Sequence, residues 1–313
     1  MKVSVAINNY NYSEYIVECI ESVLNQTYKN IEVIIIDDGS TDNSLNIITS
    51  HYSENPLIKI VSKINAGQLS AFNEAVKYIT GDIVFFLDSD DLYKKDYIEN
   101  TINVYKQNED IDFVFCALEK FYNDGKREFI HRYEKSQNLG YSILSCLYFR
   151  KGLGGETSTI SMKRSLVDNI LPLSLEADWI TRADECLNWA SSIFGAKKYY
   201  LNEALIEYRV HGSNAYCGNN FKTNYLYIYQ RINIENRFFK HIFKKYGINE
   251  NISLGSSITT DIVKLSLLEY KSIQIKTFKM FKLYAKIILN SNINILKKAQ
   301  NLKHLFFLYL NFR

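Results

Sequence analysis

The feature that most constrains the fold is a regular alternation of two hydrophobic periods over the first 115 residues. Apolar runs rich in β-branched residues cover 3–7, 31–36, 58–61, 82–87 and 111–115, and helical patterns cover 13–26, 42–51, 67–79 and 94–107. Such alternation predicts an α/β fold with a Rossmann-like, mostly parallel sheet and helices on both faces. Because the runs are continuously apolar, we expect the strands to be buried on both sides.

The pattern changes after residue 115. An Asn-Asp-Gly turn at 123–125, between two polar-apolar segments, predicts a β-hairpin. Residues 157–162 and 204–211 predict further strands, and 181–194 predict a helix. From about residue 218 onward the sequence is helical in pattern.

Charge also divides the chain near residue 217. Residues 1–217 carry a net charge of −9, whereas 218–313 hold 16 Lys and Arg against 4 Asp and Glu, a net charge of +12. This imbalance indicates two regions with different partners. We predict an α/β domain over 1–217, with halves at about 1–115 and 116–217, followed by a basic helical region over 218–313.

The cysteines and the hydropathy bear on the compartment. Five cysteines show neither a CxxC pair nor metal-ligand spacing, which predicts reduced, packed thiols: Cys19, Cys116, Cys146, Cys186 and Cys217. The first residues lack the apolar stretch of a secretory signal, and no apolar run approaches the roughly 18 residues of a membrane span. We therefore expect a cytoplasmic protein.

Polar side chains follow four of the predicted strands. They occur at Asn8 to Asn11, at Asp37 to Asp42, at Asn65, Gly67 and Gln68, and at Asp88 to Asp91. In an open α/β sheet, ligands bind beyond the carboxyl ends of the strands. Helix capping explains one such ending as well as a site does, for example at Ser40 or Asp42. Four endings on one rim predict a binding site.

The stretch "FFLDSDD" places Asp88, Asp90 and Asp91 directly after a buried strand. Two unit charges about 4 Å apart repel by about 4 kcal/mol at an effective dielectric near 20, so a bound cation or exposure to water must offset them. Asp88 and Asp90 suit Mg²⁺ or Mn²⁺, which keep waters and bridge to phosphates. Both glycine-rich phosphate motifs are missing, so a nucleotide diphosphate would be neutralised mainly by the metal. A solvated acidic turn is the alternative.

The order of the motifs resembles a known family. The segments are "VSVAINNYNYSEYIVECIESVLNQTYKNIEVIIIDDGSTDNS", "NAGQLSAFNEAV", "GDIVFFLDSDD", "ADECLNWAS" and "YRVHGSN". Over roughly residues 1–215 the chain is similar to family 2 glycosyltransferases of the GT-A fold, which are inverting enzymes that use nucleotide-sugars. "DSD" at 88–90 corresponds to the family's DXD motif.

The resemblance implies roles for individual residues. It implies that a nucleotide-sugar is bound by Asn8, Tyr10, Asp38, Asn65, Gly67, Gln68, Asp88 and Ser89. Asn8 lies where the family contacts the base or ribose, and Asp38 matches the acid that reads the uracil edge. Asp90 matches the direct metal ligand, with Asp88 and His211 beside the metal. Asp184 matches the general base that deprotonates the acceptor hydroxyl.

Inversion requires a base opposite the leaving diphosphate and an electrophile on it, which Asp184 and the metal would supply. Glu185 is the rival base, and an acid favoured by the helix dipole is the structural alternative for Asp184. His211 could equally be a structural histidine.

Four positions depart from the family pattern or have an open role in it. Phe72 stands where members often carry Arg, before the Asn that matches Asn73. Asp91 has no matched role and could cap the next helix. Gly154 and Gly155 either shape the acceptor pocket or serve a loop with positive φ.

The basic tail contains a lysine stripe at helical spacing within 273–289: Lys276, Lys279, Lys282 and Lys286. An apolar face lies opposite, so the segment is either a helix docked on the first domain or a helix at a membrane surface. Nucleic acid is disfavoured because the basic residues are interleaved with a wide apolar face.

Taken together, the sequence predicts a metal-dependent, inverting hexosyl- or N-acetylhexosaminyltransferase. It would use a UDP-sugar, with dTDP as the alternative, and an acceptor hydroxyl on a surface polysaccharide or lipid-linked glycan. We expect it in the cytoplasm, with a peripheral position on the inner face of the membrane as a second setting; the oligomeric state stays open. A haloacid dehalogenase phosphatase is disfavoured by Leu92, and a nucleotidyltransferase by the first strand's ending. A non-catalytic binding or assembly subunit of the same fold is the main rival.

Overall fold

The computed structural model describes residues 1–212, 225–248, 284–285, 287–289, 295 and 298–303. The chain forms two compact units, one of Met1–Ile143 with Gly152–Cys217 and one of Leu144–Lys151 with Gly218–Arg313. The predicted site residues all lie in the first unit. The division of residues 1–217 into two functional halves stays a prediction.

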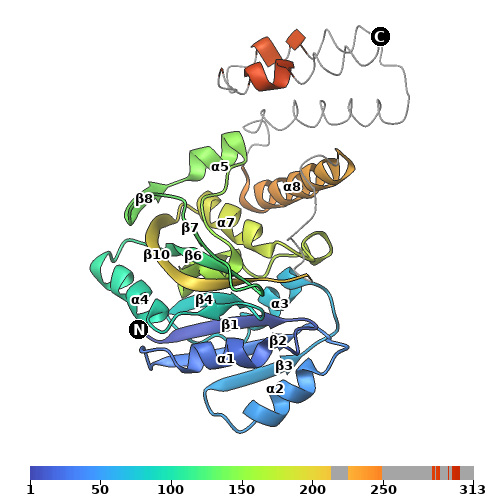
Figure 1. The fold of residues 1–313 in the computed structure, drawn as a ribbon. Helices are drawn as coiled ribbons and strands as arrows, with labels where there is room; N and C mark the ends of the chain where they lie inside the picture. The colour runs from blue at the N-terminus through green and yellow to red at the C-terminus, as the bar shows by residue number, and fades with distance from the viewer. Residues whose placement is uncertain (213–224, 249–283, 286, 290–294, 296–297, 304–313) are drawn as a thin grey trace. The chain divides into compact units, whose positions relative to one another are not determined.

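The described part of the first unit is built on one ten-stranded sheet (Figure 1). Its strands are β1 (Val3–Asn9), β2 (Ile31–Asp37), β3 (Ile58–Ser62), β4 (Ile83–Asp88), β5 (Leu92–Tyr93), β6 (Phe113–Tyr122), β7 (Arg127–Ile130), β8 (Gln137–Tyr141), β9 (Ile160–Lys163) and β10 (Lys197–Val210). The order is β3-β2-β1-β4-β9-β6-β10-β5, with β7 on β6 and β8 on β10. The first four strands pair in parallel, whereas β9 is antiparallel to both of its neighbours. The predicted α/β fold class is confirmed.

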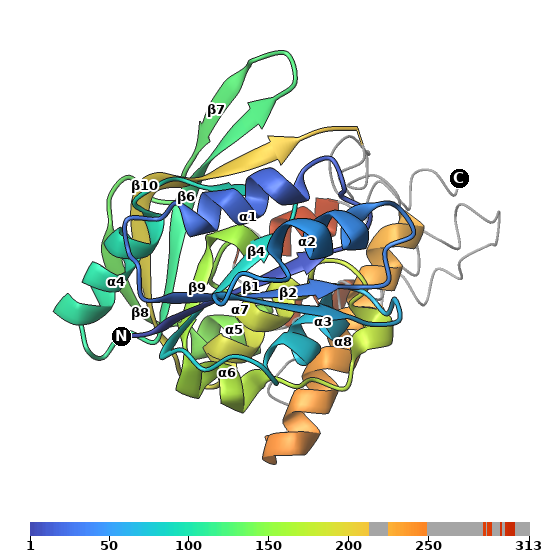
Figure 2. The same ribbon diagram turned by 90° about the horizontal axis from the view of Figure 1, so that it is seen from below.

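Helices cover both faces of the parallel half. They are α1 (Ile16–Leu24), α2 (Ser44–Tyr52), α3 (Gln68–Ala75), α4 (Tyr97–Gln107), α6 (Arg164–Ile170) and α7 (Ala183–Ile193). Figure 2 shows α1 and α2 on one side of β1 and β2 and α3 on the other. On the α1 side, Val5 and Ile7 of β1 join one core cluster with Cys19 of α1 and Ile48 of α2.

The expectation that every run is buried on both faces is right for four of the five runs and wrong for β3. β1, β2, β4 and the first residues of β6 are buried almost throughout, but β3 contains only half-buried and exposed residues. The reason is topological, because β3 is the last strand of the sheet and has a neighbour on one side only. Its apolar residues are explained by its contact with α2 and not by burial of both faces.

Two segments of the second half differ from their predicted form. Residues predicted as one strand over 157–162 begin with a 3-10 turn, η1 (Thr157–Thr159), and only then enter β9. The strand predicted over 204–211 is longer, because its start also pairs with β6 and β8. The predicted hairpin is confirmed: β6 and β7 pair antiparallel, and Gly125 takes φ 83 in the turn.

The second unit contains most of α5 (Ile143–Phe149) and all of α8 (Tyr225–Tyr246). The Arg150 guanidinium lies 3.6 Å from the centre of the Phe239 ring. Among the described residues, no helix has both the length and the apolar character needed to cross a membrane. The predicted lysine stripe lies outside the described residues, so both of its interpretations stay predictions.

Candidate active site

The strand ends of β1, β2 and β4 bring the predicted polar residues together. Asn8 of β1 pairs in register with Asp88 of β4, and Asn9 pairs with Asp37 of β2. The Asn9 amide donates to Asp37 Oδ2 at 2.8 Å, so this pair fixes the strand ends to each other. Asn8 and Asp88 form the equivalent pair one strand further along.

Asp88 is held by amides from two elements. Asn8 Nδ2 donates to its Oδ1 at 2.9 Å, and Gln68 Nε2 donates to the same oxygen at 2.8 Å. Burial and the neighbouring Asp90 raise the pKa of Asp88 to about 7, although both amides oppose the shift. The position therefore disfavours a negative charge, and a cation there would relieve it.

Asp90 and His211 lie in contact beside this carboxylate. His211 Nε2 is 3.1 Å from Asp90 Oδ2, and both residues are buried. The His211 ring packs on Tyr15, with ring centres 4.7 Å apart, and on Tyr12 at 5.6 Å. Burial, with Asp90 and Asp88 close by, raises the pKa of the Tyr12 hydroxyl. Sequence reasoning missed Tyr12, although it stands two residues after Tyr10 in the same strand ending.

Asp91 has a structural role and does not cap the next helix, contrary to the suggestion from its position. The Ser158 hydroxyl donates to its Oδ2 at 2.6 Å, and the Arg209 backbone N–H donates to its Oδ1 at 3.0 Å. The Arg209 side chain also donates to the Asp90 carbonyl at 3.0 Å. Arg209, which the sequence analysis did not single out, thus connects the acidic turn to β10, which leads to His211.

The Asp38 carboxylate accepts hydrogen bonds from the loop that follows β3. Lys63 Nζ donates to Oδ1 at 2.5 Å, and the Gly67 N–H donates to Oδ2 at 2.7 Å. Only 4% of Asp38 is exposed. Its carboxylate therefore organises residues 63–67, and its reading of a base edge stays a prediction.

The other residues predicted to contact the nucleotide-sugar differ in their exposure. Tyr10 and Asn65 are exposed, whereas Ser89 is buried. Asn8 Oδ1 and Ser89 Oγ are buried atoms without a hydrogen-bond partner among the described residues. Buried polar groups usually have partners, so these two atoms mark the strand ends as unusual.

Gly67 is required by its position at the start of α3. It takes φ 88, and a Cβ there would collide with the backbone of Ile180. The close approach is reinforced by two hydrogen bonds, from Gln68 N to the Ile180 carbonyl at 2.8 Å and from Leu69 N to the Trp179 carbonyl at 3.2 Å. The loop before α7 is therefore attached to the start of α3.

Asp184 lies in the first turn of α7. Burial and the nearby Glu156 raise its pKa to about 6, while Arg182 and Arg132 pull the pKa down. Glu185, the rival base, forms an ion pair with Arg182. Among the described residues no ion pair engages Asp184, so it is the better candidate to accept a proton near neutral pH.

The two glycines before η1 are explained by close packing rather than by positive φ. Neither Gly154 nor Gly155 has a left-handed backbone. A Cβ on Gly154 would collide with Asn188 of α7, and one on Gly155 would collide with Thr159. The Asn188 amide also donates to the Gly155 carbonyl at 2.9 Å. This loop is therefore packed directly on the helix that carries Asp184.

Lys198 is a fully buried cation in the same region, and no sequence motif marks it. Its ammonium donates to the Leu153 carbonyl at 2.5 Å and to the Asn188 carbonyl at 3.0 Å. It also donates to the hydroxyls of Ser191 and Ser192. It thereby connects α7 to the glycine loop.

Phe72 belongs to the core. It is 1% exposed, and its ring centre lies 5.0 Å from that of Phe86. The following Asn73 is also structural, because its amide donates to the Leu173 carbonyl at 2.8 Å and to Glu176. The family's arginine contact therefore has no counterpart at this position.

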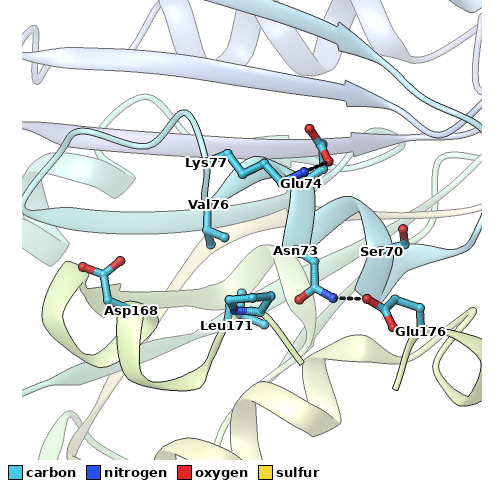
Figure 3. A pocket seen from close by; sticks show the side chains of 9 residues that line it. Ser70, Asn73, Glu74, Val76, Lys77, Asp168, Leu171 and Glu176 are labelled. Atoms are coloured by element: carbon cyan, nitrogen blue, oxygen red, sulfur yellow. Dashed lines mark hydrogen bonds and ion pairs between the residues drawn. The ribbon is translucent and has the colours of Figure 1, made fainter. Parts of the chain in front are cut away.

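A pocket of about 500 Å³ also lies in this unit (Figure 3). It is lined by α3, α6 and the turn η2 (Glu176–Asp178), with Ser70, Asn73 and Lys77 on the α3 side. Its polar groups are largely paired, Asn73 with Glu176 and Lys77 with Glu74. It contains none of the predicted site residues.

The described cysteines fit the expected packed thiols. Cys19, Cys116, Cys146 and Cys186 are buried, and none is in a disulfide among the described residues. Cys217 lies outside the described residues.

The described residues contain no group of three or more His, Cys, Asp or Glu side chains already arranged around a metal position. Mg²⁺ and Mn²⁺ do not demand such a cage, because they commonly use one or two carboxylates together with waters and substrate phosphates. Asp88 and Asp90 offer two carboxylates of this kind, and His211 contacts Asp90.

Comparisons with known proteins support the fold. The S. aureus protein TarS matches all of this chain over 54% of its own length, with a TM-score of 0.62 and 16% identity. A shorter form, TarS 1-349 in complex with UDP-GlcNAc, has a TM-score of 0.60 at 17% identity, covering 99% of this chain and 92% of that one. The architecture is that of GT-A glycosyltransferases, as predicted.

Sequence comparisons define the family. The model described as Glycosyl transferase family 2 matches residues 4–171. A Nostoc sp. protein called an uncharacterized glycosyltransferase is 34% identical over 218 residues, which is 68% of this chain and 66% of that protein. Chondroitin synthase of Escherichia coli is 39% identical over 123 residues, 39% of this chain and 18% of that enzyme. The chain belongs to glycosyl transferase family 2, and it corresponds to only part of these relatives' lengths.

Proposed function

We propose that this protein is an inverting glycosyltransferase that moves a sugar from a UDP-sugar to a hydroxyl on a glycan or a lipid-linked acceptor. The observation that carries the proposal is the arrangement of Asp88, Asp90 and His211 at the ends of β4 and β10, together with Gln68, which bonds both to Asp88 and to the backbone N–H of Ala183, the residue before Asp184. Family membership supports the reaction class. The complexes of TarS with UDP and with UDP-GlcNAc support the choice of donor.

The donor set fits a divalent cation of the Mg²⁺ or Mn²⁺ type. Asp90 and Asp88 would hold it, with His211 beside them, and the unfavourable charge at Asp88 is what a cation would offset. Such an ion stabilises negative charge that develops on a leaving diphosphate. The buried imidazole of His211 keeps Asp90 in place on one side, and Arg209 holds the Asp90 backbone on the other.

Asp184 supplies the base in this proposal. Its carboxylate takes the proton from the acceptor hydroxyl as that oxygen bonds to the anomeric carbon, and the bond from that carbon to the diphosphate breaks on the opposite face. The products are an inverted glycoside and UDP. A pKa of about 6 leaves Asp184 ionised at neutral pH but basic enough to accept a proton.

The acceptor belongs to the same proposal. Relatives called chondroitin synthase and hyaluronan synthase are named for polysaccharide products. We propose a growing surface polysaccharide or a lipid-linked glycan as the acceptor. A cytoplasmic enzyme, peripheral on the inner face of the membrane, would meet such an acceptor.

The test is an assay of nucleoside diphosphate release. Purified protein is incubated with UDP-, dTDP- and GDP-sugars in Mn²⁺, Mg²⁺ or EDTA, with and without a panel of glycan acceptors. We expect slow, metal-dependent release of UDP from one UDP-sugar without acceptor, and none from the Asp184→Asn variant. Absence of release and of UDP binding by calorimetry would refute the donor assignment and favour a non-catalytic subunit.

A further inference from the structure

The side chain of Gln68 joins three segments that are far apart in the sequence. Its Nε2 donates to Asp88 Oδ1 at 2.8 Å and to Thr157 Oγ1 at 3.1 Å. Its Oε1 accepts from the backbone N–H of Ala183 at 2.8 Å. One amide thus contacts the end of β4, the turn η1 and the first residue of α7.

The contact with Ala183 gives a partner to the first N–H group of α7. The first N–H groups of a helix lack intrahelical partners, and an N-cap side chain usually satisfies one of them. At α7 the N-cap residue is Arg182, which has φ 63 and makes no cap hydrogen bond from its side chain within the described part of the chain. Gln68, 115 residues earlier, supplies the acceptor instead. The next residue after Ala183 is Asp184.

The hydrogen bond to Asp88 acts on the donor side of the proposed reaction. Gln68 and Asn8 both donate to Oδ1 of Asp88, so this oxygen is committed to the protein. The carboxylate is thereby held in one orientation. The same Gln68 therefore sets both the acid on the donor side and the start of the helix that carries the base.

We propose that Gln68 is a positioning residue that fixes Asp184 relative to Asp88, in place of the direct nucleotide-sugar contact that its place in the sequence implied. This inference rests on the proposed function. A neutral primary amide donates to a carboxylate and accepts from a backbone N–H at once. Glutamate retains the acceptor but loses the donor, and methionine has the length with neither function.

Two variants separate these contacts. Gln68→Met removes all three side-chain hydrogen bonds at similar volume. Gln68→Glu keeps an oxygen for the Ala183 N–H but places a negative charge against Asp88. The matched control is Ser70→Ala, on the same helix but facing the separate pocket (Figure 3).

Steady-state transfer assays should split kcat from KM. Because misplacement of reacting groups by about 1 Å can lower a rate by about 100-fold, we expect Gln68→Met to lower kcat by roughly 10- to 100-fold. The donor KM should change by less than about threefold, and Ser70→Ala should behave as the wild-type protein. A donor KM raised by about tenfold or more, with kcat unchanged, would overturn the proposal and restore the direct contact.

Hydrogen exchange at the start of α7 tests the same idea without any activity. In Gln68→Met the amides around 183–186 should exchange faster, while those of β4 keep their wild-type rates. In Gln68→Glu the amides around 183–186 should stay close to wild type. Unchanged exchange in Gln68→Met would overturn the proposal even in an active enzyme. If the wild-type protein transfers no sugar, the proposed function fails, and the exchange result still decides whether Gln68 holds α7.

Discussion

Asp184→Asn is expected to abolish transfer and, at the same time, to stabilise the protein above pH 6. Burial and Glu156 raise the pKa of Asp184 from 3.8 to about 6 in the folded protein. A carboxyl whose pKa is raised by folding binds more protons in the native state between these two values. Stability from this group is therefore present below about pH 4 and is lost as the pH rises through about 6.

The size of the effect follows from the two pKa values. The interval from 3.8 to about 6, at about 1.4 kcal/mol per pH unit, corresponds to about 3 kcal/mol of lost stability at pH 7.5. Asparagine has a similar shape and no charge, so the variant should recover part of this, about 1–3 kcal/mol. At pH 4 the two proteins should have similar stability, because Asp184 is then protonated in the folded state.

The assay is urea unfolding at pH 4 and at pH 7.5, combined with UDP release. Asp184→Asn should show a higher midpoint than the wild-type protein at pH 7.5 only, and UDP release in the presence of acceptor should fall to background. The stability of the variant is compared with that of the wild-type protein at each pH. If this difference were less favourable to the variant at pH 7.5 than at pH 4, Asp184 would not be a base held in an unfavourable environment. Retained transfer would instead favour Glu185 as the base.

Three further predictions test other parts of the site. Glu156→Gln should shift the acidic limb of the kcat profile from near pH 6 to a lower pH, because Glu156 raises the pKa of Asp184; a pH series of UDP release checks this. Asp90→Asn should remove the stimulation by Mn²⁺ and reduce transfer by at least about 100-fold, measured by titrating the metal into the assay. Lys198→Met should lower the free energy of unfolding by about 2–4 kcal/mol, measured in urea, because two buried carbonyls lose a charged donor.

Much of the fold was predictable because it depends on local patterns. The alternation of apolar runs with helical periods located β1 to β4 and the helices between them, and the Asn-Asp-Gly turn located the β6–β7 hairpin. The exposed β3 could not be recognised, because an edge position is set by the order of strands and not by the composition of one run. The length of β10 escaped prediction for the same reason, since its first residues are strands only through pairing with β6 and β8.

The candidate site was predictable in its acids and not in the residues that arrange them. Asp88 and Asp90 stand in a short motif, and Asp184 and His211 stand in recognisable segments. Arg209 stands in the same segment as His211 but has no matched role there, and Lys198 lies in no motif, because both act through contacts to backbone atoms of distant segments. The hydrogen bond between the Gly67 N–H and Asp38, which folds the loop after β3, also had no signal in the sequence, and the donor contacts of both residues stay predictions.

The neutral amides around Asp88 show how the site can combine two opposed requirements. A permanent positive side chain against Asp88 would lower its pKa and would also compete with a divalent ion for the same carboxylate. Asn8 and Gln68 orient the carboxylate through hydrogen bonds without adding charge. The negative charge of Asp88 is therefore available to be neutralised by a bound cation. The cationic residues are placed one step further away: Arg209 holds the backbone of Asp90, and Lys198 holds α7. Gln68→Lys is therefore expected to lower the affinity for a divalent metal ion more than it lowers the free energy of unfolding.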